Sequence, residues 1–453
     1  MLHTPNQVTP SRAVLADSLG HIGVHLYAFT AWLSPPLHVT GLALCFFALL
    51  LEPSALRGIM QTRAFAIWGG VTLYLLFQSL WGNHLFPNSL DEQLKETWRW
   101  LGCGNFLIIG WWLKGEPRII RNTLTLGLVG LCVGVLHSVD LSALLSFQTG
   151  KQTGFHLTAS TAALLAATAL LGLLLTPPTP SLRLRHVLKL STWCATMYLM
   201  LYLLVTSQSR ATWIAALIAI PVTLRVRERR GPKTQGSQRL PGLGWGILLV
   251  MLLGIGLNRQ IILDRIMPDL AVVQSLSASR SVDTETPSSF GYRLKVQQFG
   301  LQRWSEHPLI GWGTSSTRRL IAESGRSDLW HEPTQEWLRH VHNGYLEILI
   351  RFGLLGAGIF LFSVVSLFRG FLSDGAWQQL QPGNLSWLFA GTLLMSVIWT
   401  GGAFQMTNPG WQAYWAFILA SGFSVSLFPT RPTLNAGKPS TVLPAHNHPL
   451  PNP

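Results

Sequence analysis

The sequence has few charged residues. Asp, Glu, Lys and Arg make up 11% of its 453 residues, whereas an ordinary soluble domain contains about 25%. Hydrophobic residues make up 48%, which is more apolar surface than a water-soluble core encloses beside so few charges. This composition excludes an ordinary soluble domain and indicates a protein whose solvent is largely lipid.

Cysteine is also scarce, and no other set of metal ligands takes its place. The four cysteines lie singly within apolar runs, without the spacing of a zinc site or a disulfide framework. The N-terminal region lacks a cleavable signal pattern, because Asp17, His21 and His25 interrupt the first apolar stretch. We therefore expect no metal and no cofactor, and we expect the first helix to stay as an uncleaved anchor.

Long apolar runs are present instead, and they predict an all-α polytopic membrane protein. A membrane-spanning helix needs about 20 largely apolar residues, and the sequence offers about twelve candidate runs. These runs are 15–34, 37–52, 64–82, 97–113, 119–137, 156–176, 190–206, 211–224, 242–258, 343–367, 384–402 and 411–428. We expect transmembrane helices 1 to 9 in residues 1–258 and helices 10 to 12 in residues 343–428.

The net charge of +14 would suit a nucleic-acid partner, but the basic residues cluster between apolar runs. With the N-terminus in the cytoplasm, the loops expected inside carry 18 Lys and Arg and the short outer loops carry four. The inner set is Arg12, Arg57, Arg63, Lys114, Arg118, Arg121, Arg183, Arg185, Lys189, Arg225, Arg227, Arg229, Arg230, Lys233, Arg239, Arg369, Arg431 and Lys438; the outer set is Lys95, Arg99, Lys151 and Arg210. Membrane topology produces this asymmetry. We expect membrane lipid as a partner, no nucleic acid, and both termini in the cytoplasm.

Two polar segments complete the expected organisation. Residues 259–341 are too polar to span a membrane and would form a large outer loop of short helices, flexible over its Ser- and Thr-rich part 275–289. Residues 432–453 are rich in Pro and Asn without apolar periodicity. This tail is expected to be disordered and cytoplasmic.

A short polar step at residues 206–210, Thr-Ser-Gln-Ser-Arg, separates two apolar runs. It places Arg210 at the outer membrane boundary, because an arginine deeper in lipid would cost about 2.5–3.5 kcal/mol. Arg210 fits either an interfacial arginine that reaches the lipid headgroups or a residue that binds an anion. The residues themselves leave both interpretations open.

The outer loop contains a second arginine, Arg293, near the start of an expected helix. Apolar residues in 292–304 follow a loose helical spacing that predicts an amphipathic helix. Arg293 lies near its start, where a phosphate would also meet helix N–H groups, although a solvated or headgroup-bound arginine fits as well. Gly311-Trp312-Gly313 after Pro308 predicts a tight turn and is too weak a pattern to indicate phosphate binding.

Two histidines, His340 and His342, lie where this loop enters the tenth expected span. His-x-His is found in metal sites, but no third ligand stands at a suitable spacing. A neutral imidazole is also the natural general base near neutral pH. All three places fall on the outer side, so an anion held by Arg210 and Arg293 would lie beside a histidine base.

The start of the tenth span carries its own pattern. Glu347 and Arg351 are four residues apart on the expected helix, so we expect them to pair. Gly353 and Gly356 are expected to allow close helix packing.

These motifs together resemble one family. They are Ser209-Arg210 at a helix start, Arg293 farther along, His-Pro-Leu-x-Gly-Trp-Gly at 307–313, and His-Asn-x-Tyr-Leu-x-x-Leu at 342–349 followed by Gly-Leu-Leu-Gly. Over roughly residues 195–370 the chain resembles the O-antigen ligase and O-antigen polymerase superfamily. The last two motifs are the specific ones, since a Ser-Arg step alone would mean little.

The resemblance implies a GT-C-like glycosyltransferase of the bacterial inner membrane whose active site faces the periplasm. Ligases of this family move a glycan from undecaprenyl diphosphate to lipid A–core, and polymerases join repeat units on the same carrier. By the match, Arg210 and Arg293 hold the diphosphate and His342 deprotonates the acceptor hydroxyl. The sugar C1 is then attacked with inversion, and no metal is required because arginines neutralise the leaving group.

Four neighbours are implied as supporting residues: Ser209, Arg339, His340 and Asn343. His340 is an additional histidine that competes with His342 for the role of base. Arg351 stands where relatives often have an acidic residue, a departure that bears on acceptor binding.

The motifs leave the reaction partly open. Ligase and polymerase share every motif and differ in acceptor, which is lipid A–core for one and a second lipid-linked glycan for the other; the ligase is the favoured interpretation. A transporter, as in superfamily members labelled for bicarbonate, would place ionisable residues in mid-membrane and often show repeats. Here the charges cluster at span ends and no repeat is visible, so transport and a purely structural role are the weaker alternatives.

Overall fold

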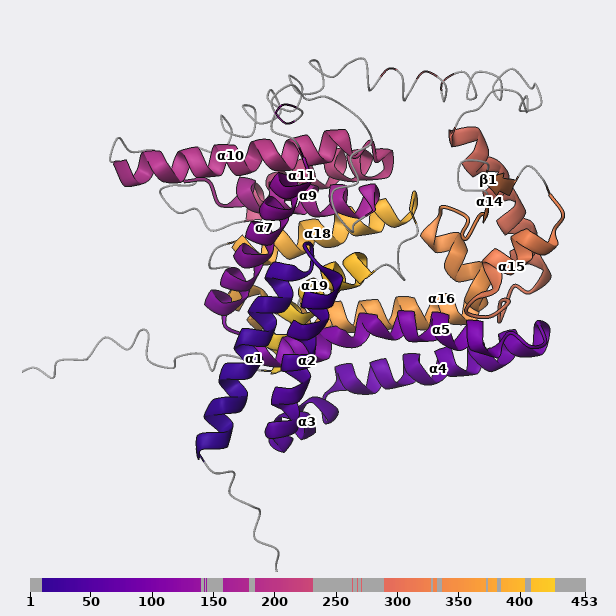
Figure 1. Ribbon diagram of the computed structural model, residues 1–453, viewed down its shortest axis with the longest axis horizontal. Coiled ribbons are helices and arrows are strands. Elements are labelled where there is room, and N and C mark those ends of the chain that lie inside the picture. Colours follow the sequence, from indigo (N-terminus) through magenta and orange to yellow (C-terminus); the bar gives the residue numbers. More distant parts are fainter. Residues whose placement is uncertain are drawn as a thin grey trace, which may run out of the picture.

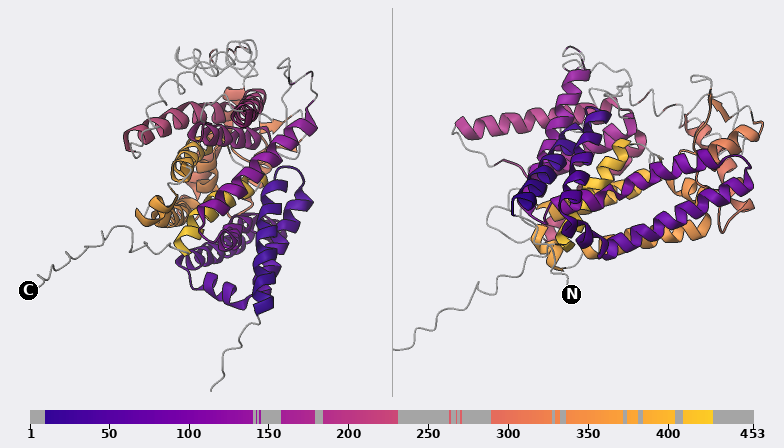
Figure 2. Two further views of the ribbon diagram at one scale, coloured as in Figure 1. Left: turned by 90° about the vertical axis from the view of Figure 1, so that its left-hand side faces the viewer. Right: turned by 60° about the horizontal axis from the view of Figure 1, so that its bottom comes forward.

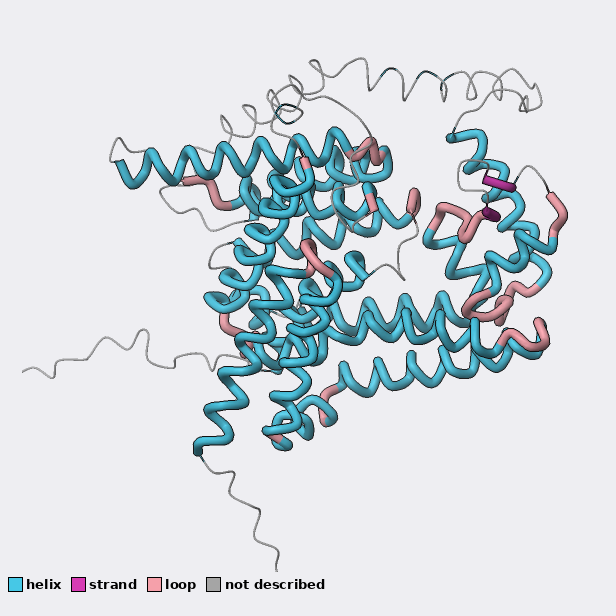
Figure 3. Tube along the Cα trace, viewed as in Figure 1, coloured by secondary structure: helices cyan, strands magenta, loops and turns pink. Residues whose placement is uncertain are grey.

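The structure is a computed structural model that describes residues 10–139, 158–178, 184–230, 289–326, 329–331, 336–371, 374–380, 384–403 and 409–427, with single positions at 142, 144, 263, 267 and 270. Helices dominate the described part, and one antiparallel pair of two-residue strands accompanies them (Figure 3). The elements are α1 Pro10–Thr30, α2 Pro35–Leu51, α3 Pro53–Met60, α4 Arg63–Leu85, α5 Leu90–Leu101, η1 Gly102–Asn105, α6 Phe106–Trp112, α7 Pro117–Ser138, α9 Ala159–Leu175, α10 Leu184–Thr206, α11 Arg210–Arg230, α14 Ser289–Glu306, α15 Ser316–Glu323, β1 Trp330–His331, β2 Glu336–Trp337, α16 Gly344–Phe371, α17 Asp374–Leu380, α18 Leu385–Thr400 and α19 Pro409–Leu427.

Among the described helices, α4, α7, α10 and α16 are long and apolar enough to cross a membrane. The pair α2 and α3, bent by 101° at its break, would add one more. The expected class, a helical membrane protein, is therefore confirmed. The count of about twelve spans and the side taken by the large loop stay predictions. The expected span 242–258, residues 275–288 of the expected flexible stretch and the tail 432–453 lie outside the described residues, while Ser289 begins α14.

Helix α9 is the centre of the largest apolar core. It is built almost wholly from Ala and Leu and buries residues on nearly every side, as a helix that is hydrophobic all round must. It packs against α10, α11 and α18. Its small side chains let these neighbours come close, and the N-terminal ends of α9 and α11 thereby meet the C-terminal end of α18.

The fourth expected span, 97–113, is divided in the structure. Its residues fall in the end of α5, in the 3₁₀ turn η1 and in α6. Gly104 explains the packing at this turn, because a methyl group there would lie 2.1 Å from Nε1 of Trp68. Helix α5 also buries a polar face, Gln93, Glu96 and Thr97, which is unusual for a helix next to lipid.

A small unit of α14, α15 and the strand pair lies at one end of the bundle (Figure 1). Helices α4, α5 and α16 run toward it side by side (Figure 2). The expected helix at 292–304 is confirmed as part of α14, with Val296 and Phe299 buried against α16. Leu301 on the same helix is 51% exposed.

Helix α16 is broken at Gly353, whose φ of 60° and ψ of −168° favour glycine. The break frees backbone groups that the 308–313 turn satisfies. Trp312 and Gly313 donate to the carbonyl oxygens of Ile350 and Arg351 at 2.9 Å. In the opposite direction, the N–H groups of Leu354 and Leu355 donate to the carbonyl oxygens of Pro308 and Leu309. The Pro-Leu-Ile-Gly-Trp-Gly motif thus holds the kink, and it confirms the expected tight turn.

The two glycines of α16 therefore have different roles. Gly356 packs closely, as expected, since a methyl group there would lie 2.9 Å from the hydroxyl oxygen of Tyr74. Gly353 instead supplies a conformation that other residues rarely adopt, and a methyl group there would meet the carbonyl oxygen of Leu309 at 2.3 Å.

Candidate functional site

The segments that carry the expected site residues meet at residues 400–403, named here the α18 end. Gly402 is the point of contact with α11, because a methyl group at Gly402 would lie 2.7 Å from Cβ of Ala211. Ala211 follows Arg210, the first residue of α11. Arg210 is half-buried beside the α18 end.

The short polar step before α11 is a tight turn in the structure. Helix α10 ends at Thr206 and α11 begins at Arg210. Between them, Gln208 takes a positive φ of 53°, and its N–H donates to the carbonyl oxygen of Val205 at 3.1 Å. The indole N–H of Trp213 donates to the carbonyl oxygen of Leu204 at 2.8 Å. The turn thereby fixes the start of α11, where Arg210 lies.

Ser209 belongs to a chain of hydroxyl groups that joins three helices. Its Oγ lies 3.1 Å from Oγ of Ser160 on α9 and 2.9 Å from Oγ1 of Thr212 on α11. Nε1 of Trp399, near the end of α18, donates to the same Ser160 oxygen at 3.0 Å. The expected supporting role of Ser209 stays a prediction, and these bonds describe how it would orient Arg210.

Arg293 comes to the α18 end from the opposite side. Its Nη1 donates to the carbonyl oxygen of Gly402 at 3.4 Å. Helix α14 reaches this position because Gly300 lets it approach α16, where a methyl group would lie 3.0 Å from Leu346 and 3.1 Å from Val341. The structure thus brings the segments of Arg210 and Arg293, which are far apart in the sequence, to the same residue, Gly402.

His342 belongs to the third segment at this place. Gly344, two residues later, packs on the α18 end, because a methyl group there would lie 2.6 Å from Cγ2 of Thr400 and 3.0 Å from the carbonyl oxygen of Ala403. His342 itself has a positive φ of 55°. A left-handed conformation is uncommon for a residue other than glycine and is often found at functional sites.

Asn343 caps α16. Its Oδ1 accepts hydrogen bonds from the backbone N–H of Tyr345 at 3.1 Å and of Leu346 at 3.2 Å. The first N–H groups of a helix have no acceptor within the helix, and asparagine is among the residues that most often cap them. The hydroxyl of Tyr345 donates to the carbonyl oxygen of Val397 on α18 at 2.7 Å. Asn343 therefore fixes where the helix begins, directly after His342.

His340 lies against His342, with ring centroids 4.3 Å apart at an interplanar angle of 72°. Nδ1 of His340 accepts a bond from the backbone N–H of His342 at 3.3 Å, so that nitrogen is deprotonated. Burial lowers the pKa of His340, the carboxylate of Glu347 opposes this, and the charges of Arg351, Arg293 and Arg339 lower it further. His340 is therefore a neutral, oriented ring surrounded by arginines.

Arg339 is exposed, two residues before this turn. Its charge acts on His340. Within the part of the chain that the structure describes, no group of three or more His, Cys, Asp or Glu side chains is arranged to hold a metal ion.

Sequence reasoning missed Glu96. The structure places it beside Arg351, where its Oε1 accepts from Nη1 of Arg351 at 2.6 Å. The expected pair of Glu347 and Arg351 is confirmed, with Oε1 of Glu347 2.7 Å from Nε of Arg351. Arg351 is 4% exposed and enclosed by these partners, so it does not bind an acceptor directly. A possible signal was the helical spacing of Gln93, Glu96 and Thr97 beside an apolar run.

Comparison with known proteins places these residues within one matched segment. Residues 195–361 match the model of a protein family described as O-antigen ligase. No curated protein matches the chain. The matched segment contains every site residue that the sequence predicts: Ser209, Arg210, Arg293, Arg339, His340, His342 and Asn343.

Proposed function

We propose that the chain, whose residues 195–361 match the O-antigen ligase family, moves a glycan from undecaprenyl diphosphate to an acceptor hydroxyl of lipid A–core. The observation that carries this proposal is the meeting of three segments at the α18 end. Ala211 packs on Gly402, Arg293 donates to its carbonyl oxygen, and Gly344 packs on Thr400. Two arginines and a histidine turn are thereby held around one point.

The arginines supply what a diphosphate leaving group needs. A guanidinium makes two parallel, charge-assisted hydrogen bonds to phosphate oxygens. Arg210 also begins a helix, whose first N–H groups favour an anion. In the proposed reaction Arg210 and Arg293 neutralise the charge that grows on the diphosphate as the bond from sugar C1 to its oxygen breaks.

The histidine turn supplies the base. The acceptor oxygen attacks C1 from the face opposite the diphosphate, and His342 takes the hydroxyl proton, so that the new glycosidic bond forms with inversion. His342 is favoured over His340 because Nδ1 of His340 already accepts the N–H of His342. The bond and the ring contact make His340 a residue that orients His342.

The proposed setting is the periplasmic face of the bacterial inner membrane, with both termini in the cytoplasm. Support comes from the 18 Lys and Arg of the expected inner loops against four in the short outer loops. A lipid-linked donor suits this setting, because its polyprenyl chain stays in the bilayer while its diphosphate reaches the boundary where Arg210 is expected.

The test is complementation of a ligase-deficient Gram-negative strain, with lipopolysaccharide separated on a gel. Wild-type protein should restore the O-antigen ladder and His342→Ala should not, at equal protein level. His84→Ala is the matched control, since His84 is an exposed histidine near the end of α4 and should leave the ladder unchanged.

Other outcomes would redirect the assignment. A full ladder with His342→Ala would show that another group is the base, and His340→Ala would be examined next. If wild-type protein restores no ladder but restores chain length in a polymerase-deficient strain, the acceptor is a second lipid-linked glycan and the chain is a polymerase.

A further inference from the structure

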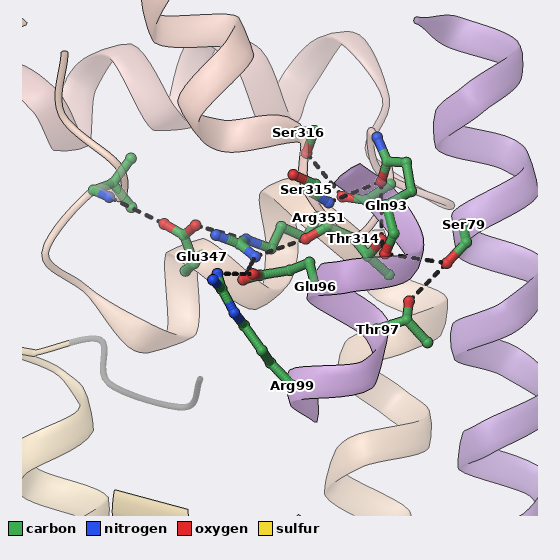
Figure 4. A network of polar contacts seen from close by, with 12 residues as sticks. Ser79, Gln93, Glu96, Thr97, Arg99, Thr314, Ser315, Ser316, Glu347 and Arg351 are labelled. Carbon is green, nitrogen blue, oxygen red and sulfur yellow. Dashed lines mark hydrogen bonds and ion pairs between the residues drawn. The ribbon is translucent and has the colours of Figure 1, made fainter. Parts of the chain in front are cut away.

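A buried ion cluster lies directly behind the histidine turn. It consists of Glu96 on α5 and Glu347 and Arg351 on α16 (Figure 4). The three residues are 8%, 0% and 4% exposed. Arg351 lies between the two carboxylates at 2.6 and 2.7 Å, and its Nη1 also donates to the carbonyl oxygen of Thr314 at 2.6 Å.

Stability alone is a poor explanation for such a cluster. Removing charges from water costs nearly as much as their attraction returns, and apolar residues of similar volume are often at least as stabilising. The buried charges are better explained by a geometry that they fix. What they fix is found by following the remaining oxygen of Glu347.

Glu347 uses its two oxygens for different partners. Oε1 accepts from Nε of Arg351 at 2.7 Å, and Oε2 accepts from the backbone N–H of Val341 at 3.0 Å. Val341 is fully buried and immediately precedes His342. The carboxylate therefore connects the ion cluster to the strained peptide that carries the expected base.

We propose that Glu347 and Arg351, supported by Glu96, are positioning residues that hold His342 in its left-handed conformation for proton transfer. This inference rests on the proposed function and adds to it the residues that orient the base. A positive φ at a histidine costs free energy, so some contact has to maintain it. Two bonds lie beside that strain: the N–H of His342 donates to Nδ1 of His340, and the N–H of Val341, the preceding residue, donates to Glu347.

The guanidinium in turn keeps Glu347 in place. Thr314, whose carbonyl accepts from Arg351, donates through Oγ1 to the backbone carbonyl oxygen of Gln93 at 2.9 Å. Oε1 of Gln93 accepts the N–H of Ser315 at 2.8 Å. Arg351 is thus fixed from α5 and from the turn after α14, and Glu347 cannot shift along α16 without breaking these bonds.

The cluster and the two arginines make different hydrogen bonds, so their effects are measured separately. Arg293 donates to the carbonyl oxygen of Gly402, whereas Glu347 accepts from the backbone N–H of Val341. Helix α14 approaches Val341 at its side chain, through Gly300. Loss of the cluster's geometry should therefore lower kcat and leave the KM for the donor nearly unchanged. A cluster that only stabilises the fold would lower the amount of folded enzyme and leave kcat per folded molecule unchanged.

Glu347→Gln is the sharpest variant. An amide has the shape of a carboxylate but one oxygen, so it accepts from Val341 or from Arg351 and not from both. We expect kcat to fall about 10- to 100-fold, as misplaced catalytic groups do, with the donor KM changed by less than about twofold. The substrates are undecaprenyl diphosphate-linked O-antigen and lipid A–core from the strain that wild-type protein complements.

Tyr74→Phe is the matched control. The Tyr74 hydroxyl donates to the carbonyl oxygen of Phe352 at 2.8 Å, so the variant also removes a buried bond to α16. It has no contact with the Val341 peptide among the described bonds, and its kcat per folded molecule should equal that of the wild type. Arg351→Lys keeps the charge but reaches fewer of the three acceptors, and its kcat should fall at least threefold.

The outcomes separate this inference from the proposed function. If His342→Ala is inactive and Glu347→Gln keeps wild-type kcat, the positioning role is wrong and the proposed function stands. If His342→Ala is fully active, the base assignment fails before Glu347 is considered. Should Arg351→Lys not fold, Glu347→Asp replaces it: its shorter carboxylate keeps the charge, reaches one partner, and should lower kcat without raising the donor KM.

Discussion

The arginines of this protein fall into two settings. Arg351 is 4% exposed and bonded to two carboxylates and a carbonyl oxygen. Arg210 and Arg293 are half-buried at the α18 end, and Arg293 donates to a backbone carbonyl there. Arg351 is therefore buried and bonded within the protein, whereas Arg210 and Arg293 are partly exposed.

The difference teaches how to assign a role to an arginine in a membrane protein. A guanidinium enclosed by carboxylates has its donors in use and no route to a ligand, so it acts on the protein itself. A guanidinium at an accessible helix end can meet a phosphate with several donors. Burial and partners, more than residue type, separate the positioning role from the binding role.

The break in α16 offers the strongest way to disrupt the enclosed setting. Gly353→Ala should lower the free energy of unfolding by about 3 kcal/mol or more, because alanine is strained at this backbone conformation. The methyl group would also meet the carbonyl oxygen of Leu309 at 2.3 Å. Gly358→Ala is the control, with nothing within 4 Å. Thermal unfolding in detergent measures both, and equal melting temperatures would contradict the role of Gly353.

Removing an accessible arginine tests the other setting. Arg210→Ala should lower kcat/KM about 100-fold or more with unchanged protein level, because the leaving group loses a charged donor. Arg303→Ala on α14 is the comparison: Arg303 pairs with Glu306 at 2.9 Å on the same helix as Arg293 and should have little effect. Retained activity in Arg210→Ala would make Arg210 an interfacial anchor.

A pair of neighbouring glycines gives a smaller and sharper test. A methyl group at Gly402 would meet Cβ of Ala211 at 2.7 Å, while one at Gly401 has no neighbour closer than 3.4 Å. Gly402→Ala should therefore displace the start of α11 by a few tenths of an ångström and weaken activity about tenfold. Gly401→Ala should be near wild type. Steady-state kinetics on both variants measures the difference, and identical values would mean that the contact at Gly402 does not position Arg210.

Much of the candidate site could be predicted from local sequence. The polar step before Arg210 separates two apolar runs, which become α10 and α11. Gly311-Trp312-Gly313 after Pro308 predicts a tight turn, and both glycines take positive φ in the structure. Glu347 and Arg351 had to pair because four residues complete about one helical turn. These expectations held because each depends on neighbours within a few residues.

Other features depend on long-range information. The run at 97–113 has the composition of one span, and the structure forms it from the end of α5, η1 and α6, with Gly104 close to Trp68. The departure at Arg351 was expected to bear on acceptor binding, and the sequence does not show that Arg351 lies buried between two carboxylates. Its burial is decided by α5, which is distant along the chain.

By itself, the sequence determined a helical membrane protein, the turn at 311–313 and the motifs by which residues 195–361 resemble O-antigen ligases, because hydrophobicity and local spacing act over short distances. Only the tertiary structure decided that Glu96 joins Arg351 across 255 residues and that three segments meet at the α18 end. A buried charge needs a partner, which can come from anywhere in the chain that the fold brings near it. A contact made by backbone atoms does not depend on a particular side chain, so the sequence gives no sign of it. Such relations arise from packing in three dimensions, which local patterns do not encode.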